Sequence, residues 1–285
     1  MTFSAFIAAH HASIRLGGFL GVFALMALWE LLAPRREARA PTGARWMNNV
    51  ALIALDTLLV RLLLPAAALA AALFAAAHGW GILHRITVAP VLATLTAVVA
   101  LDLTIYLQHV MLHALPALWR VHRVHHADLD FDVTTGVRFH PIEILLSLAV
   151  KCAAIVLIGA GPSAVVLFEV LLNASSLFTH GNVRLPRPAD RLLRLLIVTP
   201  EMHRVHHSIE EEETNSNFGF NLSWWDRLFG TYRATARLAQ SDITIGIRTF
   251  RAPRVCTRLP AMLAMPFMGE VSGYALNRRP WEPRP

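Results

Sequence analysis

The chain has 285 residues, of which 55% are hydrophobic and only 16% are charged, and its mean hydropathy is +0.48. Soluble domains carry about 25% charged residues, so this composition excludes an ordinary soluble globule and predicts an integral membrane protein. The net charge is +7, but no basic stretch is interleaved with aromatic residues, so nucleic-acid binding is not indicated. Cys152 and Cys256 form no CxxC pair, which excludes a disulfide framework and a cysteine zinc site.

Apolar runs predict an all-α, polytopic membrane bundle of about three spans plus a helical hairpin, because one span needs roughly 20 apolar residues. The three runs lie at 16–33, 50–77 and 88–112. The second is long enough to kink at Pro65. A fourth region, 141–180, exceeds one span and is broken at Gly159–Pro162, which predicts two shorter helices. We expect residues 1–285 to form a single domain.

The loop after the first run predicts the topology. It carries Arg35, Arg36, Arg39 and Arg45 against one glutamate. This excess places the loop in the cytoplasm, and the lack of a small-residue cleavage site favours an uncleaved anchor over a signal peptide. Counting spans onward, segments 113–140 and 181–240 share that side and form a histidine-rich catalytic cap. We expect the tail 241–285 on the membrane surface and the protein in a bacterial inner membrane.

Histidine is the most informative residue type, with fourteen copies, ten of them between His109 and His207. His109 and His113 form an HxxxH pair at the end of the third run, and the letters HRVHH occur twice. The two copies are His122–His126 and His203–His207. Positions i, i+3 and i+4 share a helix face, so each cluster can aim two or three imidazoles at one point.

The number of histidines favours two metals. Imidazole suits zinc, copper, iron and nickel, but a catalytic zinc takes only three protein ligands and a water. Eight clustered imidazoles therefore fit two ions better than one. The alternative, ordinary interfacial or core histidines at helix ends, does not explain a repeated motif on one side of the membrane.

Polar stripes within the spans predict supporting groups for the histidines. One stripe is Asp102, Tyr106, His109 and His113, and the other is Glu169, Asn173, Ser176 and His180, both spaced i, i+4, i+7, i+11. Metal-bound histidines commonly donate their other N–H to a carboxylate, so we expect Asp102 and Glu169 near the ligands and His180 as a ninth ligand. An interhelical hydrogen bond or ion pair is the alternative for each carboxylate. His140, in RFHP, is a ligand, a supporting donor or the polar entry to the hairpin.

The ordered motifs resemble those of a known family. HxxxH, HxxHH, RFHP, THGN and HRVHH, followed by NFG at 217–219 and WDRLFGTY at 225–232, are similar to the fatty acid hydroxylase/sterol desaturase superfamily of membrane di-iron enzymes. The similarity covers 102–232 and assigns the metal ligands to His109, His113, His122, His125, His126, His180, His203, His206 and His207. Some members have a histidine where this chain has Ser176. One ligand is therefore missing or supplied by water, Asn173 or another side chain.

The resemblance implies that two iron ions use O2 to hydroxylate or desaturate a C–H bond of a membrane lipid, such as a fatty acyl, sterol-like or carotenoid-like lipid. No GxGxxG or cytochrome b5-like HPGG segment is present, so electrons are expected from a separate reductase with a ferredoxin or cytochrome. The segment WDRLFGTY has two interpretations: a functional role through Asp226 or Arg227, or a structural turn that holds the last histidine cluster in place. We favour the structural turn. A zinc-dependent lipid hydrolase and a non-enzymatic metal-binding or transport protein remain alternatives.

Overall fold

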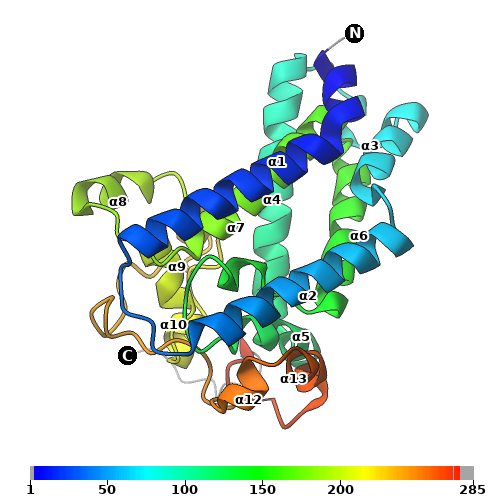
Figure 1. Ribbon diagram of the computed structural model, residues 1–285. Helices are drawn as coiled ribbons and strands as arrows, with labels where there is room; N and C mark the ends of the chain where they lie inside the picture. The colour runs from blue at the N-terminus through cyan, green and yellow to red at the C-terminus, as the bar shows by residue number, and fades with distance from the viewer. Residues whose placement is uncertain (1–2, 272, 277–285) are drawn as a thin grey trace.

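The computed structural model describes residues 3–271 and 273–276, which form helices joined by turns and short connections (Figure 1). Five helical segments are long and apolar enough to cross a membrane: Ala9–Leu32, Thr42–His84, Pro90–Ala114, Pro141–Ile158 and Pro162–Thr179. In the described part of the chain, strand-like pairing is limited to isolated bridges. The predicted all-α membrane fold is therefore confirmed.

The first two predicted spans correspond to three helices. α1 (Phe3–Leu32) begins well upstream of the predicted start, because the alanine-rich segment before the apolar run also favours a helix. α2 (Thr42–Leu63) and α3 (Ala67–His78) together form the second predicted span, and the chain breaks between them at Pro65. Proline removes a backbone donor, and Ala66 takes a left-handed conformation with φ 53. The expected kink is thus a complete break.

The remaining long helices form the centre of the bundle. α4 (Pro90–Ala114) is followed later by the predicted hairpin, α6 (Pro141–Ile158) and α7 (Pro162–Thr179). Gly159 ends α6 with φ 75, a conformation that glycine adopts without steric penalty, and Pro162 begins α7. Buried alanine, leucine, isoleucine, valine and phenylalanine side chains of α3, α4, α6 and α7 make the largest apolar core. α1 packs along α7 at its side.

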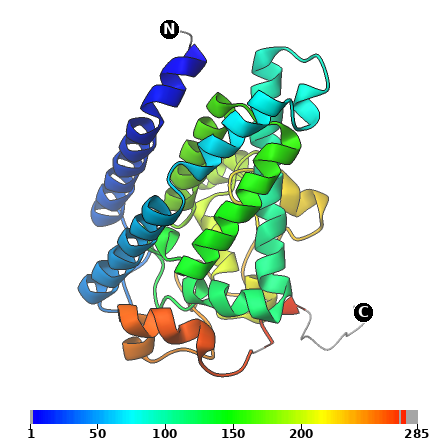
Figure 2. The same cartoon turned by 90° about the vertical axis from the view of Figure 1, so that its right-hand side faces the viewer.

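Short elements gather at the lower end of the bundle and along one side of it in Figures 1 and 2. They are α5 (Pro116–His126), α8 (Arg187–Leu193), α9 (Pro200–His206), α10 (Glu211–Thr214), α11 (Trp224–Leu228), α12 (Pro253–Cys256), α13 (Leu259–Ala264) and the 3-10 segments η2 (Thr135–Val137) and η3 (Met265–Phe267). A further 3-10 turn, η1 (Ile82–His84), lies between α3 and α4. The ends of α4 and α7 reach the same end of the bundle, so the chain builds one cap there.

The loop after α1 and the C-terminal tail both pack on this cap. Arg36 Nη1 donates to the carbonyl of Ile243 at 2.7 Å, and the backbone N–H of Arg39 donates to Asp130 at 2.6 Å. The loop and the histidine segments therefore share one side of the bundle, as predicted. In the tail, the ring of Tyr274 stacks on that of Trp119. Contact of the tail with a membrane surface stays a prediction, as does the identity of the side.

Candidate metal centre

Nine buried histidines lie in two adjacent groups inside the cap. The first group is His109, His113, His122, His126 and His206, and the second group is His125, His180, His203 and His207. Within each group the ligand atoms all lie within 4.8 Å of one another, and each histidine is at most 2% exposed. These are the nine histidines that the motifs predict as ligands. The structure thus brings all of them together.

The two HRVHH helices contribute to both groups in opposite proportions. In α5, the i, i+4 pair His122 and His126 points to the first group, and His125 points to the second. At α9 the pair His203 and His207 belongs to the second group, and His206 belongs to the first. Neighbouring residues on a helix point about 100° apart, so one short helix can serve two centres that lie side by side.

Hydrogen bonds fix the ring orientation of the first group. His109 Nδ1 is 2.8 Å from the carbonyl of Phe218, His122 Nδ1 is 2.8 Å from Glu143 Oε1, and His206 Nδ1 is 2.7 Å from the carbonyl of Ser216. A carbonyl or carboxylate oxygen can only accept, so each Nδ1 carries the proton. Each Nε2 therefore presents a lone pair to the centre of the group.

Two members of the second group follow the same rule, whereas the buried Nδ1 atoms of His203 and His207 have no partner among the described residues. His180 Nδ1 donates to the carbonyl of Ser176 at 2.7 Å, and His125 Nδ1 donates to the carbonyl of Arg138 at 3.3 Å. Their Nε2 atoms then lie 3.1 Å apart, with lone pairs facing each other. The Nε2 atoms of His203 and His207 are also 3.1 Å from that of His180.

Facing lone pairs in a buried site repel each other unless a cation lies between them. In the first group, the Nε2 atoms of His122 and His206 are each 3.1 Å from that of His109, and the buried Nε2 atoms of His113 and His126 have no partner among the described residues. With metal–nitrogen bonds of ~2.1 Å, neighbouring ligands of a tetrahedral or octahedral ion lie roughly 3.0–3.4 Å apart. The spacing, tautomers and orphaned nitrogens therefore fit a metal ion in each group.

Burial favours neutral imidazole, which is the form that binds metals. Burial lowers the pKa of His180 to about 4 and that of His206 to about 3, although backbone hydrogen bonds oppose both shifts. Burial and neighbouring imidazoles also hold the pKa well below its ordinary value at His125, His126, His203 and His207. The site is thus prepared for ligation at neutral pH.

The carboxylates predicted from the stripes lie apart from the histidines. Asp102 accepts hydrogen bonds from the side chain of Asn221 at 2.8 Å, the backbone of Leu222 at 3.1 Å and the indole of Trp225 at 2.8 Å. Its hydrogen bonds in the described structure therefore fasten the loop after the last histidine cluster, and none of them reaches a histidine. The helical spacing places Asp102 on the correct face of α4, but the partner on that face is a loop.

Glu169 forms ion pairs within the bundle. Its carboxylate lies 2.6 Å from Lys151 Nζ and 3.2 Å from Arg15 Nη1, which is the ion-pair alternative. Asn173 lines a cavity next to it. Ser176 Oγ donates to the carbonyl of Gly136 at 2.8 Å. Ser176 therefore does not add a fifth ligand to the second group.

Glu143 supports His122 and was not predicted from the sequence. It lies in the first turn of α6, directly after RFHP, and only 3% of it is exposed. His140 of the same motif caps α6, because its Nδ1 accepts from the backbone N–H of Ile142 at 3.1 Å, and its Nε2 donates to the carbonyl of Leu263 at 3.1 Å. RFHPIE thus begins a helix and places a carboxylate on a histidine. The acidic residue three positions after the motif histidine is the signal that could have found it.

The segment WDRLFGTY holds a turn beneath the first group. Asp226 accepts from the backbone N–H groups of Phe218 at 2.7 Å and Gly219 at 2.9 Å, and from Thr231 Oγ1 at 2.7 Å. The carbonyl of Phe218 in turn accepts the Nδ1–H of His109. Burial raises the pKa of Asp226 to about 6, although these hydrogen bonds oppose the shift. This geometry supports the structural role that the sequence favoured.

A buried ion network fixes the loop after α5. Arg45 Nη1 lies 2.8 Å from Asp128, and Arg138 donates to Asn49 at 2.9 Å and to the carbonyl of Val124 at 2.7 Å. Arg45 and Arg138 are at most 1% exposed. Arg45 is one of the loop arginines whose positive charge predicts the topology, and its ion pair with Asp128 gives it a structural role as well. The sequence alone did not show this second role.

A large cavity of about 810 Å³ runs from the first group into the bundle. It lies between α1, α2, α4, α6 and α7, and both His109 and His122 line its inner end. Leu16, Leu20 and Leu58 line it as well and are about half exposed. Binding sites for small molecules and cofactors are typically ~300–1,000 Å³ and mostly apolar. The cavity therefore lies between α4 and the hairpin of α6 and α7, and α1 and α2 also bound it.

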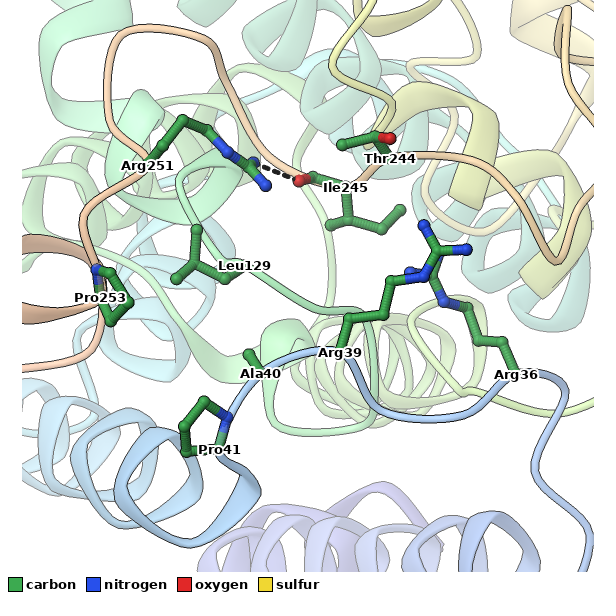
Figure 3. A pocket seen from close by; sticks show the side chains of 9 residues that line it. All are labelled: Arg36, Arg39, Ala40, Pro41, Leu129, Thr244, Ile245, Arg251 and Pro253. Atoms are coloured by element: carbon green, nitrogen blue, oxygen red, sulfur yellow. Dashed lines mark hydrogen bonds between the residues drawn. The ribbon is translucent and has the colours of Figure 1, made fainter.

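A second pocket of about 150 Å³ lies between the loop after α1 and the C-terminal tail (Figure 3). Three arginines line it, and each donates to a backbone carbonyl: Arg36 to Ile243 at 2.7 Å, Arg39 to Ser241 at 3.0 Å and Arg251 to Ile245 at 2.6 Å. Arg36 and Arg39 therefore join the loop after α1 to the tail, and Arg251 holds a turn within the tail. The pocket is too small for a lipid.

The fold and the site together define a polytopic membrane protein with a buried double histidine centre at the end of a lipid-sized cavity. The fatty acid hydroxylase family model matches residues 94–231, and relatives from the same superfamily include a human cholesterol 25-hydroxylase. The resemblance to the fatty acid hydroxylase superfamily that the motifs predicted is therefore confirmed.

Curated relatives match the same region. The chain is 34% identical over 180 residues to the ornithine lipid hydroxylase OlsE of Rhizobium tropici, which covers 62% of this chain and 51% of that protein. It is 28% identical over 160 residues to human alkylglycerol monooxygenase (56% and 35%), and 25% identical over 137 residues to human cholesterol 25-hydroxylase (47% and 49%). The chain thus spans about half or less of the length of these relatives. No solved structure matches it.

Proposed function

We propose that the chain is an O2-dependent oxidoreductase that hydroxylates or desaturates a C–H bond of a membrane lipid. The observation that carries this proposal is the arrangement of two histidine groups, with converging Nε2 lone pairs, at the inner end of a cavity lined by exposed leucines of α1 and α2. The match of residues 94–231 to the fatty acid hydroxylase family model supports it. The relatives are named for an ornithine lipid, alkylglycerols and cholesterol. All three names therefore indicate a lipid substrate, but the polar part of that lipid differs between them.

The proposal assigns the nine histidines as ligands of two iron ions, one in each group. Bound iron supplies the redox chemistry by which O2 is activated. The chain contributes the rest: backbone carbonyls and Glu143 hold the Nδ1–H groups, so the Nε2 atoms stay aimed inward. Burial of the ligands excludes bulk water, and the cavity holds the lipid next to His109 and His122.

The electrons come from a separate donor in this proposal. Hydroxylation of a C–H bond by O2, with one oxygen atom leaving as water, consumes two electrons and two protons. The donor is a reductase acting through a ferredoxin or cytochrome on the cap side of the protein. We place the cap in the cytoplasm and the bundle in a bacterial inner membrane, with the arginines of the loop after α1 as support.

Purified protein tests this function. We expect close to two iron ions per chain, and O2 uptake with a chemical or enzymatic reductant when membrane lipid is present. Lipid extracts from cells that make the protein should contain a species that has gained one oxygen or lost two hydrogens. With ¹⁸O2, hydroxylation places the label in the product. A product that forms without O2, or whose new oxygen comes only from water, would instead support the hydrolase alternative.

A further inference from the structure

Asp56, in α2, is a buried carboxylate without a partner among the described residues. Only 4% of it is exposed, and neither of its carboxylate oxygens makes a hydrogen bond. The side chain lines the large cavity. Burying a charge without a partner is strongly unfavourable, so a group that enters the cavity is the natural partner for Asp56.

Glu143 offers a second free oxygen in the same cavity. Its Oε1 accepts from His122 Nδ1, but its buried Oε2 has no partner in the described part of the chain. Glu143 lines the same cavity from α6, which packs against α2, the helix of Asp56. Two carboxylates in a site of low dielectric repel each other. A neutral hydroxyl group would leave that repulsion in place, whereas a cation offsets it and satisfies both free oxygens.

The cations that line the cavity do not fill this role in the structure. Lys151 and Arg15 are both paired with Glu169. Glu169 precedes His180 by eleven positions, so the two residues lie roughly 16 Å apart along the axis of α7. Arg61 also lines the cavity. It follows Asp56 by five positions, so the two side chains leave α2 about 140° apart.

We infer that Asp56 and Glu143 bind the ammonium group of an amino-bearing lipid. This inference rests on the proposed function and specifies its substrate class. The apolar tail then runs from the acidic pair toward Leu16 and Leu20, where the cavity meets the membrane. Because Glu143 is bonded to His122, the C–H bonds held nearest the first histidine group are those close to the amine. A sterol or a neutral ether lipid has no group that pairs with both carboxylates.

Binding of two matched probes tests the inference without turnover. Hexadecylamine and hexadecanol share one chain and differ in the polar group, and each is titrated into the purified, metal-containing protein in detergent without O2 or reductant. We expect the amine to bind at least about tenfold more tightly than the alcohol. Asp56→Asn should reduce that preference to about twofold. Glu37→Gln, which removes an exposed carboxylate outside the cavity, should retain it.

Thermal unfolding gives an independent readout. Ligands that bind only the folded state raise the unfolding temperature, so the amine should stabilise the native protein and Glu37→Gln but not Asp56→Asn. Equal binding of amine and alcohol by the native protein, or an unchanged preference in Asp56→Asn, would overturn the inference. Neither result depends on oxidation, so the proposed function would still be judged separately by O2 uptake and product analysis.

Discussion

Glu143 Oε1 lies 2.8 Å from Nδ1 of His122, so the first turn of α6 is bonded directly to a ring of the first histidine group. This hydrogen bond connects the RFHPIE segment to α5, and both of its residues line the cavity. A carboxylate behind a ligating imidazole fixes its tautomer and makes it a more basic ligand. The relationship therefore predicts how strongly the first group depends on a residue that is not itself a ligand.

Replacing Glu143 should weaken metal retention. Glu143→Ala removes the acceptor for His122 and leaves a cavity, and we expect a 10–100-fold loss of metal affinity. Glu143→Gln keeps an acceptor oxygen but loses the charge, so its loss should be smaller. Iron per chain after dialysis against graded chelator concentrations measures both. Full retention in Glu143→Ala at normal folded yield would contradict this role.

Asp102→Asn should affect stability rather than metal binding. Asp102 accepts from Asn221, Leu222 and Trp225, and an amide would present its N–H2 to donors that need an acceptor. Leaving a buried donor unsatisfied is unfavourable by about 1–3 kcal/mol. We therefore expect a lower unfolding temperature in detergent with nearly normal iron content. A metal loss as large as that of Glu143→Ala, at unchanged unfolding temperature, would instead make Asp102 a support of the metal centre.

The two histidine groups should lose metal separately. His113→Ala removes a ligand from the first group and His203→Ala removes one from the second, so each variant should retain about one iron per chain, since remaining ligands still define the other site. His140→Asn is the matched control, because His140 is buried but caps α6 and belongs to neither group. Asparagine is also a good helix cap, so the control should keep both ions. Full loading of either alanine variant would remove that histidine from the ligand set.

The sequence predicted which histidines assemble but not how they divide. A repeated HRVHH shows that each helix has three imidazoles near one face. Whether His125 joins His122 or His180 depends on how α5 and α9 face each other, and that orientation comes from packing between segments about 80 residues apart. The five-and-four division is therefore a property of the tertiary structure.

Periodicity located polar faces correctly and misidentified their partners. Asp102 and Glu169 lie on the expected faces, but a loop contacts the first and Arg15 and Lys151 contact the second. A stripe shows which way a side chain points, whereas the group that meets it comes from another segment. Glu143 was missed for the opposite reason, because it belongs to no stripe and is defined by its distance from a capping histidine.

Acidification should destabilise the protein once its metal has been removed. The pKa of His180 is lowered by burial to about 4 and that of His206 to about 3, from an ordinary 6.5. A folded-state pKa below the unfolded value means that the unfolded chain binds protons first. The stability is therefore fully present above pH 6.5 and is lost as the pH falls toward the folded values. For His180 alone the loss between pH 7 and pH 5 is about 2 kcal/mol.

Asp226 should oppose this trend but not reverse it. Its pKa is raised by burial to about 6, so its contribution to stability is present at low pH and is lost as the pH rises through 6. One carboxyl group is outweighed because burial lowers the pKa of several histidines in the same site. Thermal unfolding of chelator-treated protein between pH 7.5 and pH 5 should therefore show a steady fall in unfolding temperature. In Asp226→Asn that fall should be steeper, because the opposing carboxyl group is gone. An unfolding temperature that stays constant or rises on acidification would mean that these histidines are not buried in the neutral form.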